Sequence, residues 1–482
     1  MFQHRRFLLI LLLLLLTGCG GVTEPEATET TGPETAAPAP LLSPSQEPPP
    51  EPEAEKLRLT LAIRGRTATQ LRSNLDDDEP YTYVNLGASP LKLESVSGEA
   101  IHTLYVSFLD QPWDYELLYP DGSVQTVSNP MLHQTVRLEQ PAAGLEIRTP
   151  AKVTNHLCEL SAYGEGRLPP EVQDWQWMED GAADLCLFPA HADDEYVMFG
   201  GVIPYYAGEL GCKVQLCWMT HHRLEPVRNH ELLNALWTAG CVYYPQIQYE
   251  ATDVMVKSYA AALQYYSFED WEAYQVEMIR KYRPLVVLSH DEKGEYGHGA
   301  HILAAMTLEQ AVVDAADSGS FPDSAGKYGT WDVPKTYLHL YGRAEERTVM
   351  DFGKPLSHFD GMTMYDVAAK CYRCHESQYY GTTFRVYRNG TAYAAISFGL
   401  YRSTVGPDSD KNDLLENVDP NTAATAKQPG SSHRYTVPDD WAIPLSYGSP
   451  IEKSRATNHS PLCSCLRGLF CSPVSLFSLP KR

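Results

Sequence analysis

The chain has 482 residues, a length that suits about two to four domains with sizeable cores. Its 61 acidic residues outnumber its 38 lysines and arginines, so the formal net charge is −23. Because no basic stripe compensates for this charge, the sequence argues against nucleic acid or an anionic membrane surface as a partner. The balance fits a soluble protein that acts on neutral or cationic substrates.

The N-terminus carries an export signal. Three basic residues at positions 4–6 precede the apolar run Phe7–Leu16, which is too short to span a bilayer as a mature helix. The sequence Leu16-Thr17-Gly18-Cys19 resembles a bacterial lipobox, in which the cysteine is lipidated and becomes the mature N-terminus. We therefore predict a lipoprotein signal peptide over residues 1–19. The protein would be exported and lipid-anchored through Cys19 on the outer face of the cytoplasmic membrane or otherwise at the cell surface. An ordinary signal peptide cleaved nearby is the alternative.

Residues 20–56 differ in composition from the rest of the chain. Pro, Glu, Thr and Ala dominate, and no Lys or Arg occurs between Gly20 and Glu55. Such a segment cannot bury enough apolar area to offset its ordering entropy. We predict a disordered, extended tether that holds the folded part away from the membrane.

Residues 57–168 have the pattern of an antiparallel β-sandwich, with short alternating runs separated by turn signals. The expected strands are Leu57–Ile63, Leu104–Phe108, Tyr115–Leu118, Val124–Val127, Val136–Leu138 and Gly144–Ile147. Pro120-Asp121-Gly122 marks a hairpin turn. The strand order and the acidic loop Asp76–Glu79 resemble discoidin-type, galactose-binding-like modules. A sugar-binding role and a purely structural role both stay open.

From residue 178 to 415, apolar strand-like runs alternate with helical segments. The expected strands are Leu185–Phe188, Val214–Met219, Pro284–Leu288 and Tyr337–Tyr341, and the expected helices are Asn229–Ala239, Phe268–Tyr282, Ile302–Val313 and Met362–Ser377. This alternation predicts an α/β domain with a Rossmann-like, mostly parallel sheet. Residues 416–482 are turn-rich, and no acidic residue follows Glu452, so we predict an irregular or disordered tail. Its Cys463, Cys465 and Cys471 lack a recognisable fourth metal ligand.

Chemically active side chains follow two of the expected strands. One strand leads into His191, Asp193 and Asp194, and another into His298 and His301. Because ligands of open α/β sheets bind outside the carboxyl ends of the strands, we expect these side chains to meet. Residues three apart share one face of a helix, so both later histidines can point at one spot. An acidic cluster after a strand is also typical of a helix N-cap, but histidines at two strand ends favour a metal site.

Four ordered motifs resemble those of the zinc-dependent PIG-L (LmbE-like) N-deacetylases. They are His191-Ala192-Asp193-Asp194-Glu195, Arg228 with Glu231, Tyr296-Gly297-His298-Gly299-Ala300-His301, and His375-Glu376-Ser377-Gln378. The resemblance covers residues 182–415. Two positions depart from the family pattern. Ala192 replaces the common proline, and Ala300 replaces an aspartate that tunes the neighbouring histidine in many relatives.

The resemblance implies a metal-dependent hydrolase that removes N-acetyl groups from N-acetylglucosamine-type sugars or glycoconjugates. The implied metal ligands are His191, Asp194 and His301, the implied catalytic residues are Asp193, His298 and Tyr296, and the implied substrate-binding residues are Arg228 and His375. Zn²⁺ would activate a water, although such a donor set also accepts Fe²⁺ or Co²⁺. Asp193 would be the general base, while His298, as an imidazolium, and Tyr296 would stabilise the oxyanion.

Two alternatives compete with this interpretation. Cys371, Cys374 and His375 have the spacing of a c-type haem attachment site. A non-catalytic, cell-surface carbohydrate-binding protein would instead use the β-sandwich alone, and Ala300 is the observation in its favour.

Other histidines and cysteines are expected to lie outside the catalytic site. The histidines at positions 221, 222, 230 and 290 follow expected strands and could line a pocket, but a surface position on a polar loop is favoured. The cysteines at positions 158, 186, 212, 217 and 241 are expected to be buried small apolar side chains.

Overall fold

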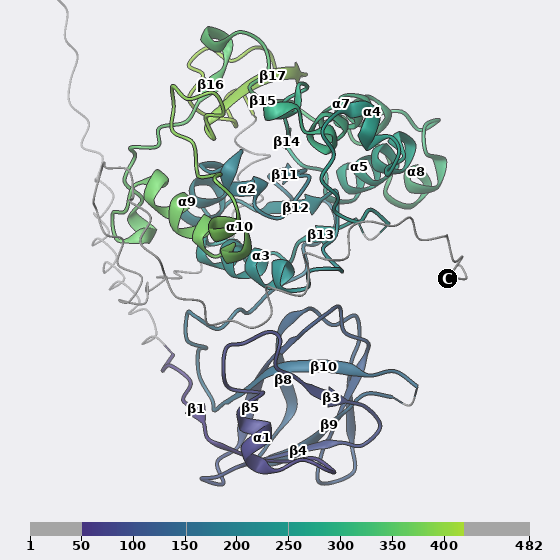
Figure 1. The fold of residues 1–482 in the computed structure, drawn as a ribbon, viewed down its shortest axis with the longest axis vertical. Helices are drawn as coiled ribbons and strands as arrows, with labels where there is room; N and C mark the ends of the chain where they lie inside the picture. Colours follow the sequence, from purple (N-terminus) through teal and green to yellow (C-terminus); the bar gives the residue numbers. More distant parts are fainter. Residues whose placement is uncertain (1–50, 151, 249, 419–482) are drawn as a thin grey trace, which may run out of the picture. The chain divides into compact units, whose positions relative to one another are not determined.

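Three β-sheets organise the part of the chain that the structure describes (Figure 1). The computed structural model describes residues 51–150, 152–248 and 250–418. The signal peptide with Cys19, nearly all of the tether and nearly all of the C-terminal tail lie outside these described residues. From Pro52 onward the described residues belong to one compact unit. Within these ranges, no helix combines the length and the apolar character that a bilayer crossing needs.

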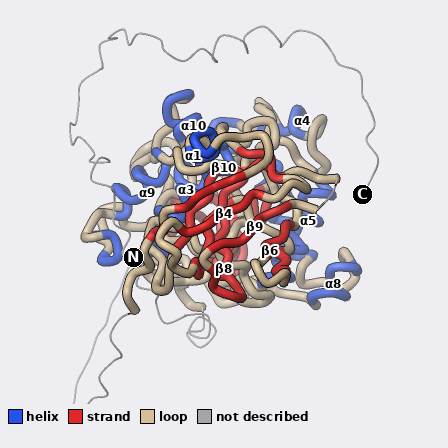
Figure 2. The backbone as a smooth tube through the Cα atoms, turned by 90° about the horizontal axis from the view of Figure 1, so that it is seen from below, coloured by secondary structure: helices blue, strands red, loops and turns tan. Residues whose placement is uncertain are grey.

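The first part of the described chain forms two five-stranded antiparallel sheets, several strands of which are seen in Figure 2. Its elements are β1 (Lys56–Leu57), β2 (Leu59–Ala62), α1 (Ala68–Arg72), β3 (Val84–Leu86), β4 (Leu91–Ser95), β5 (Ile101–Phe108), β6 (Tyr115–Leu118), β7 (Val124–Val127), β8 (His133–Ala142), β9 (Gly144–Arg148) and β10 (Asn155–Tyr163). One sheet has the order β1-β10-β5-β8, with β3 beside β10, and the other has the order β2-β4-β9-β6-β7.

Alternation of apolar and polar residues explains these strands. In β4, Leu91 and Leu93 are buried while Lys92 between them is exposed, as expected for a sheet with one solvated face. The predicted hairpin of β6 and β7 is confirmed, and its turn places Gly122 at φ +89°. The single strand predicted over residues 57–63 is wrong. The chain crosses from one sheet to the other at Arg58, so β1 pairs with β10 and β2 with β4.

The second part of the described chain is an α/β region. Its elements are β11 (Leu185–Leu187), α2 (Asp194–Val197), η1 (Ile203–Glu209), β12 (Val214–Trp218), α3 (Val227–Thr238), β13 (Gln246–Ile247), α4 (Tyr259–Ala262), α5 (Phe268–Tyr282), β14 (Val286–Ser289), α6 (Gly294–Gly297), α7 (Gly299–Asp314), α8 (Pro322–Tyr328), β15 (Lys335–His339), η2 (Ala344–Glu346), β16 (Thr348–Val349), η3 (Ser357–Phe359), α9 (Met364–Arg373), α10 (Glu376–Gly381) and β17 (Ser397–Ser403). The sheet order is β13-β12-β11-β14-β15-β17-β16. The first five strands in that order pair in parallel, which confirms the predicted mostly parallel sheet. The strand β17 pairs antiparallel with both β15 and β16.

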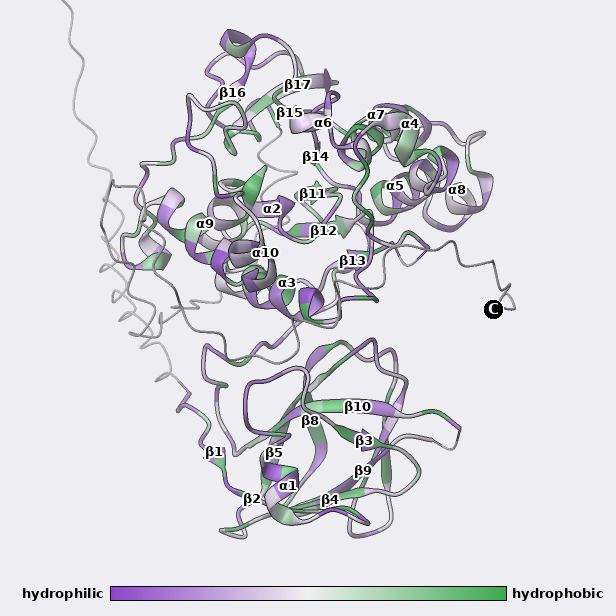
Figure 3. Cartoon of the chain, in the orientation of Figure 1, coloured by the Kyte–Doolittle hydropathy of each residue, from purple (hydrophilic) through white to green (hydrophobic). Residues whose placement is uncertain are grey.

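Both faces of the central strands are buried. In β11, Leu185 and Leu187 join the core that also contains residues of α2, α3 and α9, whereas Cys186 joins a second core with α5 and α7. The sequences of these strands are therefore continuous apolar runs rather than alternations of apolar and polar residues. Figure 3 shows the hydrophobic colouring on these central elements. The five cysteines expected to be buried, at positions 158, 186, 212, 217 and 241, are indeed buried.

Two predicted elements end differently in the structure. The late strand is β15, which begins two residues earlier than expected and gives way to Leu340 at φ +56°. The single helix predicted over residues 362–377 is interrupted between α9 and α10. His375 leaves the helical conformation there, at φ −81° and ψ +62°, and its Nε2 lies 2.6 Å from Glu195 Oε1. A tertiary contact therefore overrides the local helical pattern.

A buried histidine pair joins the antiparallel sheets to the α/β region. His133 Nε2, on β8, lies 2.7 Å from His230 Nδ1, on α3. The other ring nitrogen of His133 lies 2.8 Å from Gln173 Oε1, which can only accept a hydrogen bond. His133 therefore donates to Gln173 through Nδ1 and accepts from His230. Nearby, the Leu132 amide donates to the Tyr244 hydroxyl at 3.0 Å.

This pair predicts a loss of stability in mild acid. Burial lowers the pKa of His133 well below its usual value and that of His230 to about 4, so both rings are neutral in the folded protein. Below the ordinary value of about 6.5, the unfolded chain takes up protons that the folded chain does not. Because of His230 alone, the free energy of unfolding should fall by up to about 3 kcal/mol as the pH falls from 6.5 to 4.

Urea unfolding between pH 7 and pH 4 measures this effect. The His230→Asn variant lacks the titrating ring and should lose less stability over that range than the parent. Equal losses in the two proteins would show that the pair contributes nothing to acid sensitivity.

Candidate metal centre

The first wall of the site is the turn that follows β11. The amide of His191 donates to Asp194 Oδ2 at 2.8 Å, which folds the turn back on itself. Asp193 adopts φ +131°, a conformation that L-residues rarely take. Its amide donates to Glu195 Oε2 at 2.9 Å. Strain at a single residue between two bonded neighbours is typical of a functional turn.

The second wall is the start of α7, beyond β14. His298 is the N-cap residue and His301 lies in the first turn, so their rings face the turn after β11. Gly299 is required between them, because a Cβ there would lie 2.1 Å from the carbonyl oxygen of Ser258. The close approach of these two segments positions both histidines.

Three potential ligand atoms converge between these walls. His191 Nδ1 lies 3.0 Å from Asp194 Oδ2 and 3.2 Å from His301 Nε2, and the last two atoms are 3.3 Å apart. All three side chains are buried. Zinc bonds of about 2.1 Å in tetrahedral geometry separate neighbouring ligand atoms by roughly 3.4 Å, so this donor set fits a zinc ion. The structure thus brings together the predicted ligands; their role as ligands stays a prediction. His298 and His290 lie close enough to form further ligand groups with these residues.

A buried carboxylate that sequence analysis missed organises the histidines. Glu295 Oε2 lies 2.6 Å from His301 Nδ1, and its Oε1 lies 3.1 Å from His290 Nδ1 and 2.9 Å from His339 Nδ1. Glu295 also has a positive φ of 55° and a fully buried side chain. These contacts leave Nε2 of His301 free to act as a donor to a metal, an arrangement common around zinc. Glu295 lies outside any recognised motif, so only its position beside Tyr296 could have suggested it.

The two adjacent aspartates have opposite electrostatic environments. Burial alone would raise the pKa of Asp194, but His301, His290 and His191 outweigh it and hold that pKa well below its usual value. Burial and the neighbouring Asp194 charge raise the pKa of Asp193 to about 8. Asp194 therefore stays ionised, as a metal ligand must, while Asp193 can exchange a proton near neutral pH.

The structure does not support an imidazolium at His298. Burial, with repulsion from His191 and His301, lowers the pKa of His298 to about 2. Its Nδ1 is buried without a hydrogen-bond partner. The nearby Ala300 has no carboxylate to offer that nitrogen. His298 is therefore a neutral imidazole in this structure.

Tyr296 lies at the edge of the site. Its ring centroid is 5.4 Å from that of His301 and 5.6 Å from that of His298, and 38% of the residue is exposed. Burial and the nearby Asp194 raise its pKa, so the phenol keeps its proton. Tyr296 is therefore a hydrogen-bond donor at the open side of the site.

Arg228 is buried rather than solvated on its helix face. Its guanidinium donates to the carbonyl of Ala192 at 2.7 Å and to Asp253 Oδ2 at 2.7 Å. The other carboxylate oxygen of Asp253 lies 3.5 Å from His191 Nε2. Asp253 follows β13 in a loop without a recognisable motif, and sequence analysis missed it.

His375 does not line an open surface. It is fully buried, and its Nε2 contacts Glu195, the residue that also accepts the Asp193 amide. Glu231 in turn accepts from the amide and the hydroxyl of Ser377, at 2.7 and 2.6 Å. The late motif therefore supports the turn that carries Asp193.

One other expectation is wrong. The histidines at positions 221, 222, 230 and 290 are all buried instead of lying on the surface. His222 even accepts the Ala192 amide through Nε2 at 3.1 Å. The burial of Cys371 and Cys374, and the contact of the adjacent His375 with Glu195, argue against the haem alternative.

Comparison with known proteins matches part of this chain to one family. Residues 186–312 match the PIG-L family, described as GlcNAc-PI de-N-acetylase. A 1D-myo-inositol 2-acetamido-2-deoxy-alpha-D-glucopyranoside deacetylase of Saccharopolyspora erythraea is 26% identical over 283 residues, which is 48% of this chain and all of that protein. The deacetylase of the same description from Rhodococcus jostii is 31% identical over 179 residues, 32% of this chain and 60% of that protein. An N,N'-diacetylchitobiose deacetylase structure from Pyrococcus horikoshii has a TM-score of 0.31 and 16% identity, covering 41% of this chain and 71% of that one. The predicted resemblance to PIG-L deacetylases is confirmed.

The position of Glu295 makes metal affinity testable. Glu295→Gln removes the charge that faces His301, His290 and His339, so we expect zinc to bind about 10- to 100-fold more weakly. Competition with a chromophoric chelator measures this dissociation constant. Glu292→Gln is the matched control, because that partly exposed glutamate lies three residues away and contacts none of these histidines. Equal affinities in the two variants would contradict the proposed support of the site.

Proposed function

We propose, from the PIG-L domain that residues 186–312 carry, that this chain is a metal-dependent N-deacetylase. Its substrates would be N-acetylglucosamine-type sugars or glycoconjugates. The observation that carries the proposal is the convergence of His191 Nδ1, Asp194 Oδ2 and His301 Nε2, with Asp193 adjacent. Relatives described as deacetylases of 2-acetamido-2-deoxy-glucopyranosides support the sugar class.

A zinc ion held by His191, Asp194 and His301 would acidify a water molecule and polarise the amide carbonyl. Fe²⁺ or Co²⁺ also suits this donor set. Three protein ligands would leave one position for water, which is the arrangement of catalytic rather than structural zinc sites. An intact donor set of this kind argues against a purely carbohydrate-binding protein.

The chain's own residues supply the proton transfers and the hydrogen bonds. Asp193, the carboxylate adjacent to Asp194, can accept a proton from the attacking water and return it to the departing amine. The Tyr296 phenol faces the site as a donor and would bind the carbonyl oxygen as negative charge develops there. Neutral His298 can also donate one hydrogen bond, which replaces the imidazolium predicted from the resemblance.

Substrate would be positioned on the Arg228 side of the site. Asp253 and the Ala192 carbonyl fix the guanidinium, so little side-chain entropy is lost when a sugar hydroxyl binds. His375 acts at a distance, through Glu195 and the backbone of Asp193, rather than by touching substrate.

Two further regions flank the proposed catalytic domain. We infer that residues 57–168 form an accessory β-sandwich, supported by the two antiparallel sheets and by apolar residues of both sheets in one core. We also infer export and lipid anchoring through Cys19, supported by the sequence of residues 1–19 alone.

Acetate release from metal-loaded protein tests the reaction. A panel of N-acetylhexosamine glycans is the substrate, and Asp193→Asn should reduce the rate by about 10²–10⁴-fold because the general base is lost. Asp180→Asn, at an exposed position, is the matched control. An Asp193→Asn protein as active as its control would remove Asp193 from the mechanism. No release from any glycan by the metal-loaded parent would overturn the proposed function.

Lipid anchoring has an independent test. Cells that express the full chain should incorporate radiolabelled palmitate into it, and Cys19→Ala should abolish both the label and membrane partitioning, because the thiol is the acylation site. A Cys19→Ala chain that still partitions with membranes would contradict the lipobox interpretation.

A further inference from the structure

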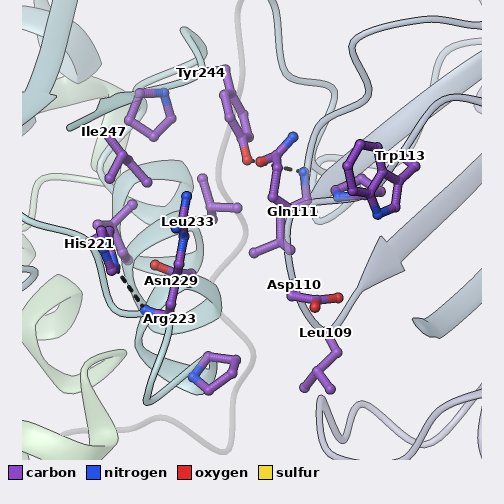
Figure 4. A pocket seen from close by; sticks show the side chains of 15 residues that line it. Leu109, Asp110, Gln111, Trp113, His221, Arg223, Asn229, Leu233, Tyr244 and Ile247 are labelled. Carbon is purple, nitrogen blue, oxygen red and sulfur yellow. Dashed lines mark hydrogen bonds between the residues drawn. The ribbon is translucent and has the colours of Figure 1, made fainter. Parts of the chain in front are cut away.

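A cavity of about 480 Å³ lies between the loop after β5 and the start of α3 (Figure 4). The β5–β6 loop contributes Asp110, Gln111 and Trp113 to its lining. The opposite wall comes from the α/β region and includes Arg223 and Asn229. This volume falls within the range of about 300–1,000 Å³ that is typical of small-molecule sites.

The loop that carries Trp113 is held rigidly. The Trp113 amide donates to Asn155 Oδ1 at 2.8 Å, and Asn155 Nδ2 donates back to the Trp113 carbonyl at 2.9 Å. Gln111 Nε2 donates to the Pro130 carbonyl at 2.7 Å. Even so, 47% of Trp113 remains exposed. A large aromatic residue that is fixed in place yet half exposed, in the lining of a cavity, is typical of a preorganised binding surface.

The lining chemistry favours a neutral, hydroxyl-rich ring. An indole face packs against the C–H face of a pyranose, while planar amide, carboxylate and guanidinium groups pair with its hydroxyls. Asp110, Asn229 and Arg223 supply these groups. The single acidic and single basic side chain balance each other, and Asp110 already lies 3.3 Å from His156 Nδ1. Neither a strongly anionic nor a strongly cationic ligand fits this balance.

The cavity and the metal centre share one wall. His221 lines the cavity, whereas the next residue, His222, contacts the Ala192 amide and Asp253 beside the metal centre. In α3 the same division recurs: Arg228 contacts Ala192 and Asp253, and Asn229 lines the cavity. Two adjacent pairs of residues therefore separate the cavity from the metal centre, which places the two sites close together.

We propose that this cavity binds a sugar ring of a glycan, distal to the acetamido group that is hydrolysed at the metal centre. The proposal rests on the proposed deacetylase function for the nature of the glycan. The β-sheet region then contributes Trp113 directly to substrate binding, and the protein prefers oligosaccharides to single sugars.

Binding to catalytically impaired protein tests the cavity without relying on turnover. In full-length protein carrying Asp193→Asn, linear β-1,4-linked oligomers of N-acetylglucosamine should bind more tightly than free N-acetylglucosamine in calorimetric titrations. Adding Trp113→Ala should weaken oligomer binding about tenfold, because stacking is lost, and Trp113→Phe should restore part of it. Val124→Ala, equally exposed but on β7, is the control and should change nothing.

Kinetics on the active protein separate this proposal from the proposed function. Trp113→Ala should raise KM for the oligomer about tenfold, with kcat and the kinetics on the single sugar unchanged. Acetate release with the same oligomer KM in Trp113→Ala and Val124→Ala would overturn the cavity proposal and leave the deacetylase intact. Trp113-dependent oligomer binding without any acetate release would support the cavity and overturn the reaction. Absence of oligomer binding to the Asp193→Asn protein, or binding that Trp113→Ala leaves unchanged, would overturn the cavity proposal.

Discussion

The buried carboxylate of Glu295 is the interaction on which the site depends. It faces one imidazole from the end of β14, one from α7 and one from β15, so it fixes three elements relative to one another. Neighbouring histidines hold its pKa well below the usual value against the effect of burial, which keeps the charge in place. A lone buried charge would be very costly, and removing it would leave His290, His301 and His339 without their acceptor. The orientation of His301 toward Asp194 follows from this contact.

Two neighbouring aspartates beside these histidines differ in their ionisation. Asp194 lies among imidazoles and remains ionised, whereas Asp193 lies beside another carboxylate, and its pKa rises. In the proposed mechanism the same sequence motif would thus supply a ligand and a base, because one carboxylate is surrounded by positive charge and the other is not. Glu195 and His375 stabilise the unusual backbone of Asp193 from behind. The late His-x-Ser-Gln motif is therefore part of the scaffold around Asp193.

The antiparallel sheets are joined to this catalytic region by specific contacts rather than by a linker alone. His133 and His230 form a buried pair, and the Leu132 amide is bound by Tyr244. These contacts hold the Trp113 loop opposite the helix that carries Arg228. A sugar chain bound along this arrangement would meet a recognition surface and a reactive centre that share one rigid wall, which reduces the entropy lost on binding.

The sequence by itself determined the class of fold, the order of the main strands and helices, and the residues that meet at the candidate metal centre. It could do so because buried parallel strands are continuous apolar runs, and the carboxyl ends of such strands meet at one edge of the sheet. Tertiary structure alone decided the roles of Glu295 and Asp253, which belong to no local pattern and act through residues distant in the sequence. It also decided the neutral state of His298 and the burial of His375, since a pKa depends on desolvation and on charges that only the folded chain brings near.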